Sequence, residues 1–258
     1  TLEDMSNYYD EIEKTRKEMI SALTYPTLVT VFAIGVVTFI ILYVVPKFQD
    51  IYRSNGMTLT GLTAFLINLS AFLKQYIGFI LAGLVLVSLG LYISYKNNKE
   101  FRRNVQILAM KLPVIGNIII YNEMTIFTKT FASLLKNNVY ITESIDILSK
   151  ITNNEIYKEI MIKTIDNIAR GDKISDAFKD QWAVPEVAYY MIVTGESTGQ
   201  LAEMMSRVSS YYQTLHKSIV NQMKSIIEPV MIVVLAVMVG GIILAVIMPM
   251  FQLYNSIL

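Results

Sequence analysis

The chain contains no cysteine and one histidine among its 258 residues. The lack of cysteine excludes disulfide scaffolds, thiolate zinc sites and cysteine nucleophiles, and a lone histidine excludes metal sites built from several histidines. Charged residues make up 17% of the chain, against roughly 25% in soluble domains. The net charge of +1 indicates no bulk attraction to nucleic acid. This composition disfavours an ordinary soluble enzyme.

Hydrophobic residues are abundant, at 53% of the chain, and the mean hydropathy is +0.46. They concentrate in three windows without any charge, residues 19–46, 75–95 and 229–258, which are 28, 21 and 30 residues long. A bilayer core needs about 20 apolar residues of helix. The windows therefore predict three transmembrane helices, at residues 25–46, 76–95 and 228–249, rather than buried core helices.

Most charges lie between the second and third windows, where residues 99–228 hold 29 of the chain's 43 charged residues. This distribution predicts a soluble domain at residues 96–227. Basic residues cluster before the first span and after the second, so the N-terminal arm (residues 1–24) and this domain are expected to be cytoplasmic. Residues 47–75 are predicted to form an extracytoplasmic loop with a helix, and residues 250–258 an extracytoplasmic tail.

The chain contains an internal repeat at an offset of 203 residues, beginning at Ser6 and at Ser209 without gaps. The matching residues include Tyr8-Tyr9 with Tyr211-Tyr212, Pro26 with Pro229, and Pro46 with Pro249. Such a match indicates duplication. Two copies that cross the membrane in the same direction need a return helix, which residues 76–95 supply. The repeat also predicts that residues 1–24 are the C-terminal end of a first cytoplasmic helical domain.

The soluble domain is predicted to be an antiparallel bundle of about six helices. One expected helix covers residues 124–137, and a second begins near Thr142. A capping box from Thr152 to Glu155 is expected to open a third, which stops at Gly171. A fourth should run from Pro185 to Gly195. Residues 197–200 are expected to cap the last helix, which has no breaker from Leu201 to Glu228 and should continue into the third span.

Several short motifs occur in a fixed order around the three spans. They are Leu112-Pro113-Val114-Ile115-Gly116, Gly171-Asp172-Lys173-Ile174-Ser175-Asp176-Ala177-Phe178, Gly195-Glu196-Ser197-Thr198-Gly199-Gln200-Leu201, Tyr211-Tyr212, Glu228-Pro229 and Pro249-Met250-Phe251. In this order they resemble the type II secretion F-protein family, over essentially the whole chain. That family includes the inner-membrane platform proteins of type IV pili and competence pseudopili. Asn137-Asn138-Val139 departs from the family's usual glycine turn, although asparagine tolerates the left-handed conformation.

The resemblance implies an all-α integral membrane protein without catalytic activity or cofactor. It implies a homo-oligomeric platform in the bacterial inner membrane that couples a cytoplasmic assembly ATPase to the insertion of pilin subunits into a filament. The implied partners are that ATPase, prepilins or pseudopilins, and other inner-membrane assembly proteins, with no direct contact to nucleic acid. The alternative is a transporter or channel subunit with a cytoplasmic regulatory domain, although the spans lack the ionisable groups that such proteins use.

The family motifs supply the candidate site residues, each with a structural or a partner-coupling role. They are Pro113, Gly116, Gly171, Pro185, Gly195, Glu196, Gly199, Leu201, Tyr211, Tyr212, Glu228, Pro229 and Pro249. Glu196 is expected either to favour the first turn of a helix through the helix dipole or to act in coupling. Outside the motifs, Arg102 and Arg103 are expected near lipid headgroups, Trp182 as a packing anchor, and His216 in a solvated or interfacial position.

Overall fold

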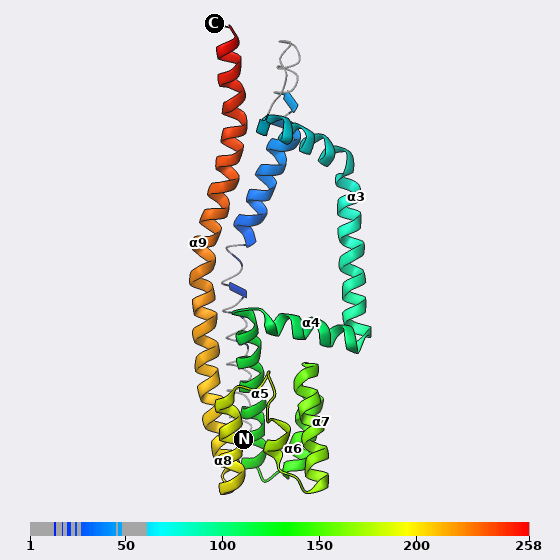
Figure 1. The fold of residues 1–258 in the computed structure, drawn as a ribbon, viewed down its shortest axis with the longest axis vertical. Coiled ribbons are helices and arrows are strands. Elements are labelled where there is room, and N and C mark those ends of the chain that lie inside the picture. Colours follow the sequence, from blue (N-terminus) through cyan, green and yellow to red (C-terminus); the bar gives the residue numbers. More distant parts are fainter. Residues whose placement is uncertain are drawn as a thin grey trace. The chain divides into compact units, whose positions relative to one another are not determined.

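The computed structural model describes residues 27–44, 46–47 and 61–257, together with Glu13, Lys17, Ile20, Ser21 and Thr24. Within these residues the fold is helical and contains no strand, which confirms the all-α prediction (Figure 1). The labelled elements are η1 (Ile40–Val44), α3 (Gly61–Asn97), α4 (Lys99–Lys111), α5 (Ile115–Lys136), α6 (Ile141–Ile151), α7 (Glu155–Arg170), η2 (Ile174–Ala177), α8 (Glu186–Thr198) and α9 (Leu201–Ile257). Residues 27–39 are also helical.

The chain divides into two compact units. The first comprises residues 1–16 and 92–223, and the second residues 17–91 and 224–258. Helices α3 and α9 each begin in one unit and end in the other. The first unit contains the predicted soluble domain except residues 224–227, and the second contains the three charge-free windows except residues 92–95.

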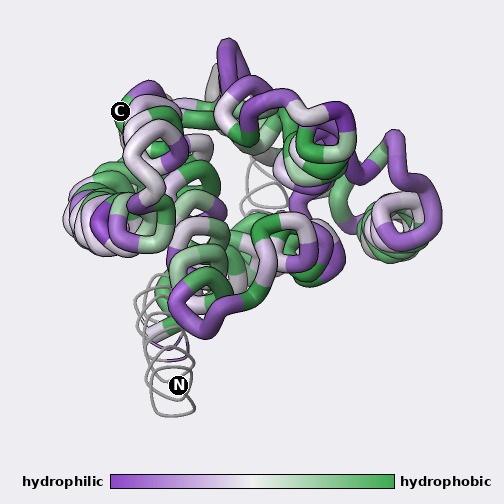
Figure 2. The backbone as a smooth tube through the Cα atoms, turned by 90° about the horizontal axis from the view of Figure 1, so that it is seen from below, coloured by the Kyte–Doolittle hydropathy of each residue, from purple (hydrophilic) through white to green (hydrophobic). Residues whose placement is uncertain are grey.

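The first unit is a helical bundle with a single apolar core. α5 contacts α4 and α6, α7 contacts α4, α6 and η2, and η2 also contacts α8. The helices have hydrophobic and hydrophilic residues at different positions around their circumference (Figure 2), which lets each bury one side. The largest fully buried side chains include Tyr157, Tyr212, Phe131, Phe178, Met124, Ile145, Ile192 and Met205.

Two turns in the bundle confirm sequence predictions. α7 ends at Arg170, and Gly171 follows in the left-handed conformation with φ of 80°, which glycine adopts without steric penalty. In the turn after α5, Asn138 has φ of 59°. This turn therefore keeps its left-handed residue although it lacks glycine.

The predicted capping box at the start of α7 is wrong. Thr152 is the C-terminal cap of α6, and the N-cap of α7 is Asn154, whose Oδ1 accepts hydrogen bonds from the amides of Ile156 and Tyr157 at 3.0 and 3.4 Å. Glu155 is thus the first residue of α7, and its side chain takes no part in capping the helix. Asparagine and threonine both cap helices well, so the residue types alone do not show whether Thr152 or Asn154 is the N-cap of α7.

The end of α8 also differs from the prediction. The helix continues past Gly195 to Thr198, and Gly199 is its cap with φ of 69°. The hydroxyls of Ser197 and Thr198 donate back to the carbonyl of Thr194, at 3.0 and 2.7 Å. They therefore bond within α8 and do not cap α9. At the other end, Pro185 directly precedes the helix as its N-cap, within one residue of the predicted start.

The second unit exposes large apolar side chains. Phe32, Phe79 and Val237, for example, are 72%, 77% and 70% exposed. Among the described residues, two helices are long and apolar enough to cross a bilayer by length and composition, Thr27–Val44 and Leu201–Gly241. Two bent pairs, Ile67–Ile80 with Ala82–Asn97 and α4 with α5, would raise the number to four. The three predicted spans thus stay a prediction, because these helices are candidates only.

A polar contact joins two helices of the second unit. The Ser70 hydroxyl donates to the carbonyl of Ile41 at 2.5 Å, and Ile41, Ile67 and Ser70 are buried. Ile41 belongs to η1, a π-helical turn, and such a turn alters the regular backbone bonding of an α-helix. The first part of α3 therefore contacts η1, which continues the helix of residues 27–39.

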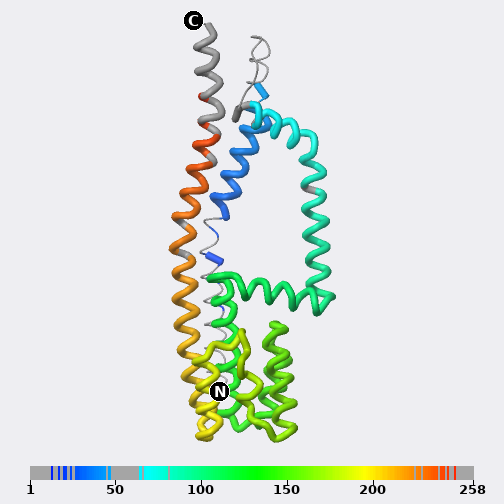
Figure 3. Tube along the Cα trace, viewed as in Figure 1, coloured from blue at the N-terminus to red at the C-terminus, as the bar shows by residue number. Residues whose placement is uncertain are grey.

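Helix α9 is continuous from Leu201 to Ile257, over 57 residues (Figure 3). This confirms that no break separates the bundle part of the helix from the charge-free part. Pro229, Pro249 and the pair Gly240-Gly241 all lie within it. Of the first repeat copy, Tyr8-Tyr9 and Pro26 lie outside the described residues.

Candidate functional site

Two of the family motifs meet through the Glu196 carboxylate. Glu196 lies in the last turn of α8, and its Oε1 accepts a hydrogen bond from the Ile174 amide at 2.6 Å. Its Oε2 accepts from the Ser175 amide at 3.1 Å and from the Ser175 hydroxyl at 2.6 Å. Glu196 therefore satisfies the free amides at the start of η2. The first-turn role predicted for it is wrong, since it serves the N-terminus of a different helix.

The glycines of the Gly195–Leu201 motif have separate roles. A Cβ at Gly195 would lie 2.9 Å from Leu201 Cα and 3.1 Å from Met204 Cβ, so only glycine permits α8 to approach α9 this closely. Gly199 has open space around it, and glycine is favoured there because the residue has a positive φ. Leu201 is buried. Together these residues fix the sharp connection between the two helices.

The Pro113–Gly116 motif forms a tight turn between α4 and α5, whose axes differ in direction by 110°. Val114 has φ of 67° and ψ of −57°, and the Ile115 amide donates to the Pro113 carbonyl at 2.8 Å. This is a strained γ-turn for a β-branched residue. A Cβ at Gly116 would lie 2.0 Å from the Met110 carbonyl oxygen, so the turn excludes any side chain there.

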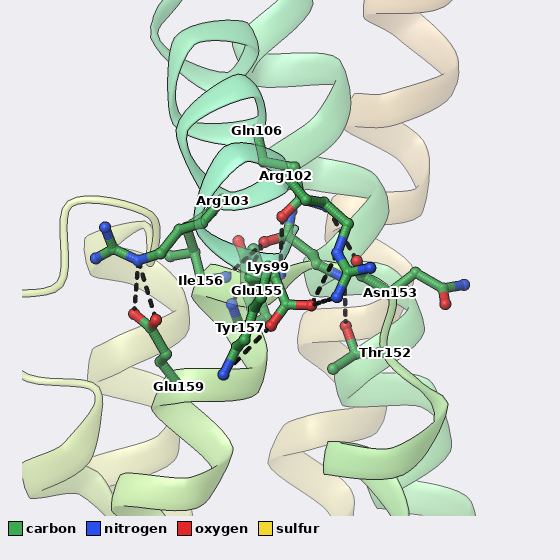
Figure 4. A network of polar contacts seen from close by, with 11 residues as sticks. Lys99, Arg102, Arg103, Gln106, Thr152, Asn153, Glu155, Ile156, Tyr157 and Glu159 are labelled. Carbon is green, nitrogen blue, oxygen red and sulfur yellow. Dashed lines mark hydrogen bonds and ion pairs between the residues drawn. The ribbon is translucent and has the colours of Figure 1, made fainter. Parts of the chain in front are cut away.

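A polar network holds α4 against α7 (Figure 4). Arg102 donates to Glu155 Oε1 through Nε at 3.0 Å and also through Nη2. The Glu155 side chain is almost completely buried, at 4% exposure. Its Oε2 accepts no hydrogen bond from the described residues and lies 3.7 Å from Lys99 Nζ. Because this pair is buried, loss of either partner would leave the other charge buried without compensation.

The network continues on both sides of that pair. Arg103 Nε donates to both oxygens of Glu159, at 2.9 and 3.2 Å, in an exposed pair. Gln106 donates to the Asn153 carbonyl at 3.0 Å and accepts from the Glu155 amide at 2.8 Å. The guanidinium groups predicted to lie near lipid headgroups therefore face α7. The sequence placed Glu155 near a helix start, but nothing in its pattern identified its partner.

A second acidic side chain, Glu123 on α5, lines a small cavity of about 10 Å³, near the volume that one water molecule needs. Thr152 Oγ1 donates to Glu123 Oε2 at 3.3 Å. Burial raises the pKa of the Glu123 carboxyl to about 7, and the Thr152 hydrogen bond opposes the rise. The other lining residues are Ile126, Phe127, Leu148, Ile151, Thr152, Tyr157 and Met161. This carboxyl, which sequence reasoning missed, can change charge near neutral pH.

The paired tyrosines of α9 face different environments. Tyr212 is buried with its ring 5.5 Å from that of Tyr121, whereas Tyr211 is 48% exposed. Burial, with a contribution from Tyr211, raises the pKa of Tyr212 to about 12. Tyr212 is therefore a core residue, and Tyr211 is available at the surface.

His216 was predicted to be solvated or interfacial, and of these the solvated position is wrong, because His216 is 9% exposed and burial lowers the pKa of its imidazole. Trp182, predicted to be a packing anchor, is 48% exposed, with Lys111 Nζ 5.8 Å from its ring centroid. A single aromatic or histidine without periodic neighbours gives no sequence signal for burial.

The remaining motif residues, Glu228, Pro229 and Pro249, lie along α9 in the second unit. Among the described residues, no group of three or more His, Cys, Asp or Glu side chains could hold a metal ion. The motifs of the first unit instead converge on helix junctions. Fold and site thus define an α-helical protein in which a helical bundle shares a long helix with an apolar unit.

Comparison with known proteins agrees with this class. The family model of the type II secretion system protein F matches residues 1–46 and 127–249. The chain is 28% identical to the type IV pilus assembly protein PilC of Pseudomonas aeruginosa over 256 residues, and 30% identical to PilC of Thermus thermophilus over 260 residues. It is 27% identical to the type II secretion system protein F of Vibrio cholerae over 255 residues.

The chain belongs to the type II secretion system protein F family, because the family model covers more than half of its residues. The matches to these three relatives include 99%, 99% and 98% of this chain. They include 68%, 63% and 62% of the relatives. The chain therefore spans about two thirds of the length of the proteins it resembles.

Proposed function

We propose that this chain is an inner-membrane platform subunit of a type IV pilus-like assembly or type II secretion machine. In this role it couples a cytoplasmic assembly ATPase to the insertion of pilin subunits into a filament. Family membership and the relatives' names, which specify pilus assembly and type II secretion, support the general role. The chain itself acts as a scaffold rather than as a catalyst.

The observation that carries the coupling is the continuity of α9. Its first part contributes Leu201, Met205, Val208 and Tyr212 to the core of the bundle, and its last part is an apolar helix of the second unit. A helix anchored by core packing transmits a displacement of the bundle along its axis, because interiors are densely packed. A pull on the bundle would thus reach the apolar second unit.

The proposed topology follows the charge pattern of the sequence. Residues 25–46, 76–95 and 228–249 cross the membrane, the bundle at residues 96–227 lies in the cytoplasm, and the C-terminus lies outside. The proposed duplication rests on the sequence repeat, and most of each copy lies within the two segments that the family model matches. The chain assembles with further copies of itself and with prepilins or pseudopilins.

Deletion of the gene and photo-crosslinking together test the role. Deletion should remove surface filaments, or secretion of the system's substrates, and expression of the intact protein should restore them. A photo-reactive residue at the exposed Tyr190 of α8 should capture the assembly ATPase. Normal filaments and normal secretion in the deletion strain would contradict the proposal.

The alternative, a transporter or channel subunit, has a different signature. Purified protein in liposomes would then conduct ions or release a trapped dye. The platform role predicts sealed liposomes, because the charge-free windows of the three proposed spans contain no Asp, Glu, Lys, Arg or His.

A further inference from the structure

Helix α4 has two chemically different faces. One carries Arg102, Gln106 and the buried Met110 toward the bundle. On the opposite face Phe101, Val105 and Leu108 recur at intervals of four and three residues, which places them within a sector of roughly 60°. Val105 and Leu108 are 38% and 67% exposed. α4 thus contacts the bundle through polar groups together with Met110 and Ile107, and it also presents an apolar face outward.

The apolar surface continues past the end of α4. Leu112, Val114 and Ile115 are 45%, 41% and 41% exposed. We define the α4 apolar patch as Val105, Leu108, Leu112, Val114 and Ile115. Scattered exposed apolar residues are ordinary, but a contiguous group of them marks a surface that another partner covers.

We infer that the α4 apolar patch lies in the membrane interface, where the headgroup region of anionic lipids covers it. The inference rests on one part of the proposed function, that α3 crosses the bilayer. Only Asn98 separates the last residue of α3 from the first residue of α4, so α4 cannot lie far from the surface at which α3 ends. An amphipathic helix at this position is well placed to lie in the plane of the interface.

The charges around the patch fit an anionic lipid surface. Between Lys96 and Lys111 the chain has five basic residues and one acidic residue, Glu100. Arg102 and Arg103 bind acidic residues of α7. Lys99 Nζ also lies 3.7 Å from Glu155 Oε2, but the Lys99 side chain is 58% exposed. Long lysine side chains at a membrane boundary place their stems along apolar atoms and their ammonium groups among phosphates.

Trp182 provides a second indication from a distant part of the sequence. Its ring is 48% exposed and lies close to Lys111, at the end of α4. Tryptophan is enriched at membrane interfaces because its ring is apolar and its N–H is polar. An exposed tryptophan beside a basic, apolar helix is explained by the same lipid surface that covers the patch.

The α4–α7 network gives this surface a mechanical role. The buried Arg102–Glu155 pair and the two Gln106 hydrogen bonds fix α4 to α7. A helix held by lipid on one face and by the bundle on the other sets the depth and tilt of the bundle beneath the membrane.

The absence of cysteine allows a direct test with single labels. Leu108→Cys, Tyr140→Cys and Leu84→Cys are each labelled with an environment-sensitive fluorophore and reconstituted in nanodiscs of phosphatidylcholine and phosphatidylglycerol. Tyr140, 79% exposed beyond the far end of α5, is the matched control in the same unit. Leu84 reports on α3 itself. Nitroxide lipids carry the quencher either near the headgroup or near the end of the acyl chain.

The shallow quencher should reduce the Leu108 signal at least about twofold more than the Tyr140 signal, because interfacial helices lie within the outer part of the leaflet. Equal quenching at Leu108 and Tyr140, with Leu84 quenched by the deep nitroxide, would overturn the inference and leave the span intact. An unquenched Leu84 would overturn the span and the inference together. A Leu108 label that is shielded from water but not quenched would show that protein covers the patch, which also overturns the inference.

Discussion

The buried carboxylate of Glu155 depends on Arg102 for its hydrogen bonds from side chains. Replacing Arg102 by alanine leaves that charge buried, so Arg102→Ala should destabilise the bundle by about 3 kcal/mol. Thermal unfolding of the purified protein measures the change. Arg103→Ala is the matched control, since its pair with Glu159 is exposed and should be worth no more than about 1 kcal/mol. Equal effects of the two variants would contradict the assignment.

The Glu196 carboxylate offers a second test at the residue scale. Glu196→Ala should leave the amides of Ile174 and Ser175 without their acceptor, at a cost of about 1–3 kcal/mol. The change should appear in the unfolding of the protein even where no partner is present. Glu186→Ala on the same helix, at an exposed first-turn position, should cost less than about 1 kcal/mol. A stability unchanged by Glu196→Ala would favour a role in partner coupling instead.

Glu123 should make the stability of the bundle depend on pH. Its folded pKa of about 7 exceeds the usual 4.5, so between these values the unfolded chain loses the proton first, and stability falls as pH rises. Glu123→Gln lacks this titration. The variant should therefore gain about 2–3 kcal/mol relative to the original protein between pH 4.5 and pH 8. Unfolding curves at both pH values measure the difference, and parallel behaviour of the two proteins would refute the pKa assignment.

At the scale of the elements, glycine is required for two different reasons, a close contact between helices at Gly116 and a left-handed backbone conformation at Gly199. A Cβ at Gly116 would meet the backbone of Met110, whereas Gly199 has open space and a positive φ. Gly199→Ala should cost about 1–2 kcal/mol. Gly116→Ala should cost clearly more, because α4 and α5 must separate, and the protein should show a lower unfolding temperature. A smaller loss for Gly116→Ala than for Gly199→Ala would show that the turn can relax.

The sequence predicted helix positions correctly where the spacing of apolar residues and the turn residues indicated the same boundary. Gly171 and Asn138 ended helices as expected, and the absence of a breaker after Leu201 predicted a continuous α9. The start of α7 was missed because Thr152, Asn153 and Asn154 are all acceptable caps. The start of α5 at Ile115, well before residue 124, was missed because its turn rests on an unusual conformation of Val114.

The contacts that build the site were the least predictable part. The Glu196 bonds to Ile174 and Ser175 join positions about twenty residues apart, and the Arg102–Glu155 pair joins positions 53 apart in sequence. Hydrophobic period reports which face of a helix is buried but not which charged side chains meet across a junction. The family resemblance identified Glu196, yet only the structure shows what it binds.

At the scale of the whole molecule, three proposals combine. The bundle receives force from an ATPase, α4 holds the bundle at the membrane surface, and α9 carries displacement into the apolar unit. The first requires a partner and the second a lipid surface. The third depends on this chain alone, through a helix that continues from a packed core into a charge-free segment.

The most direct test changes the stiffness of α9 without changing its length. Residues 221–223, near the end of the bundle unit, are replaced by Gly-Gly-Gly in one variant and by Ala-Ala-Ala in its matched control. Glycine weakens a helix by about 1 kcal/mol per residue relative to alanine. We expect both variants to insert into the membrane. The alanine variant should assemble filaments or secrete substrate, and the glycine variant should be at least about tenfold less active. Equal activity of the two variants would contradict the claim that α9 transmits the movement.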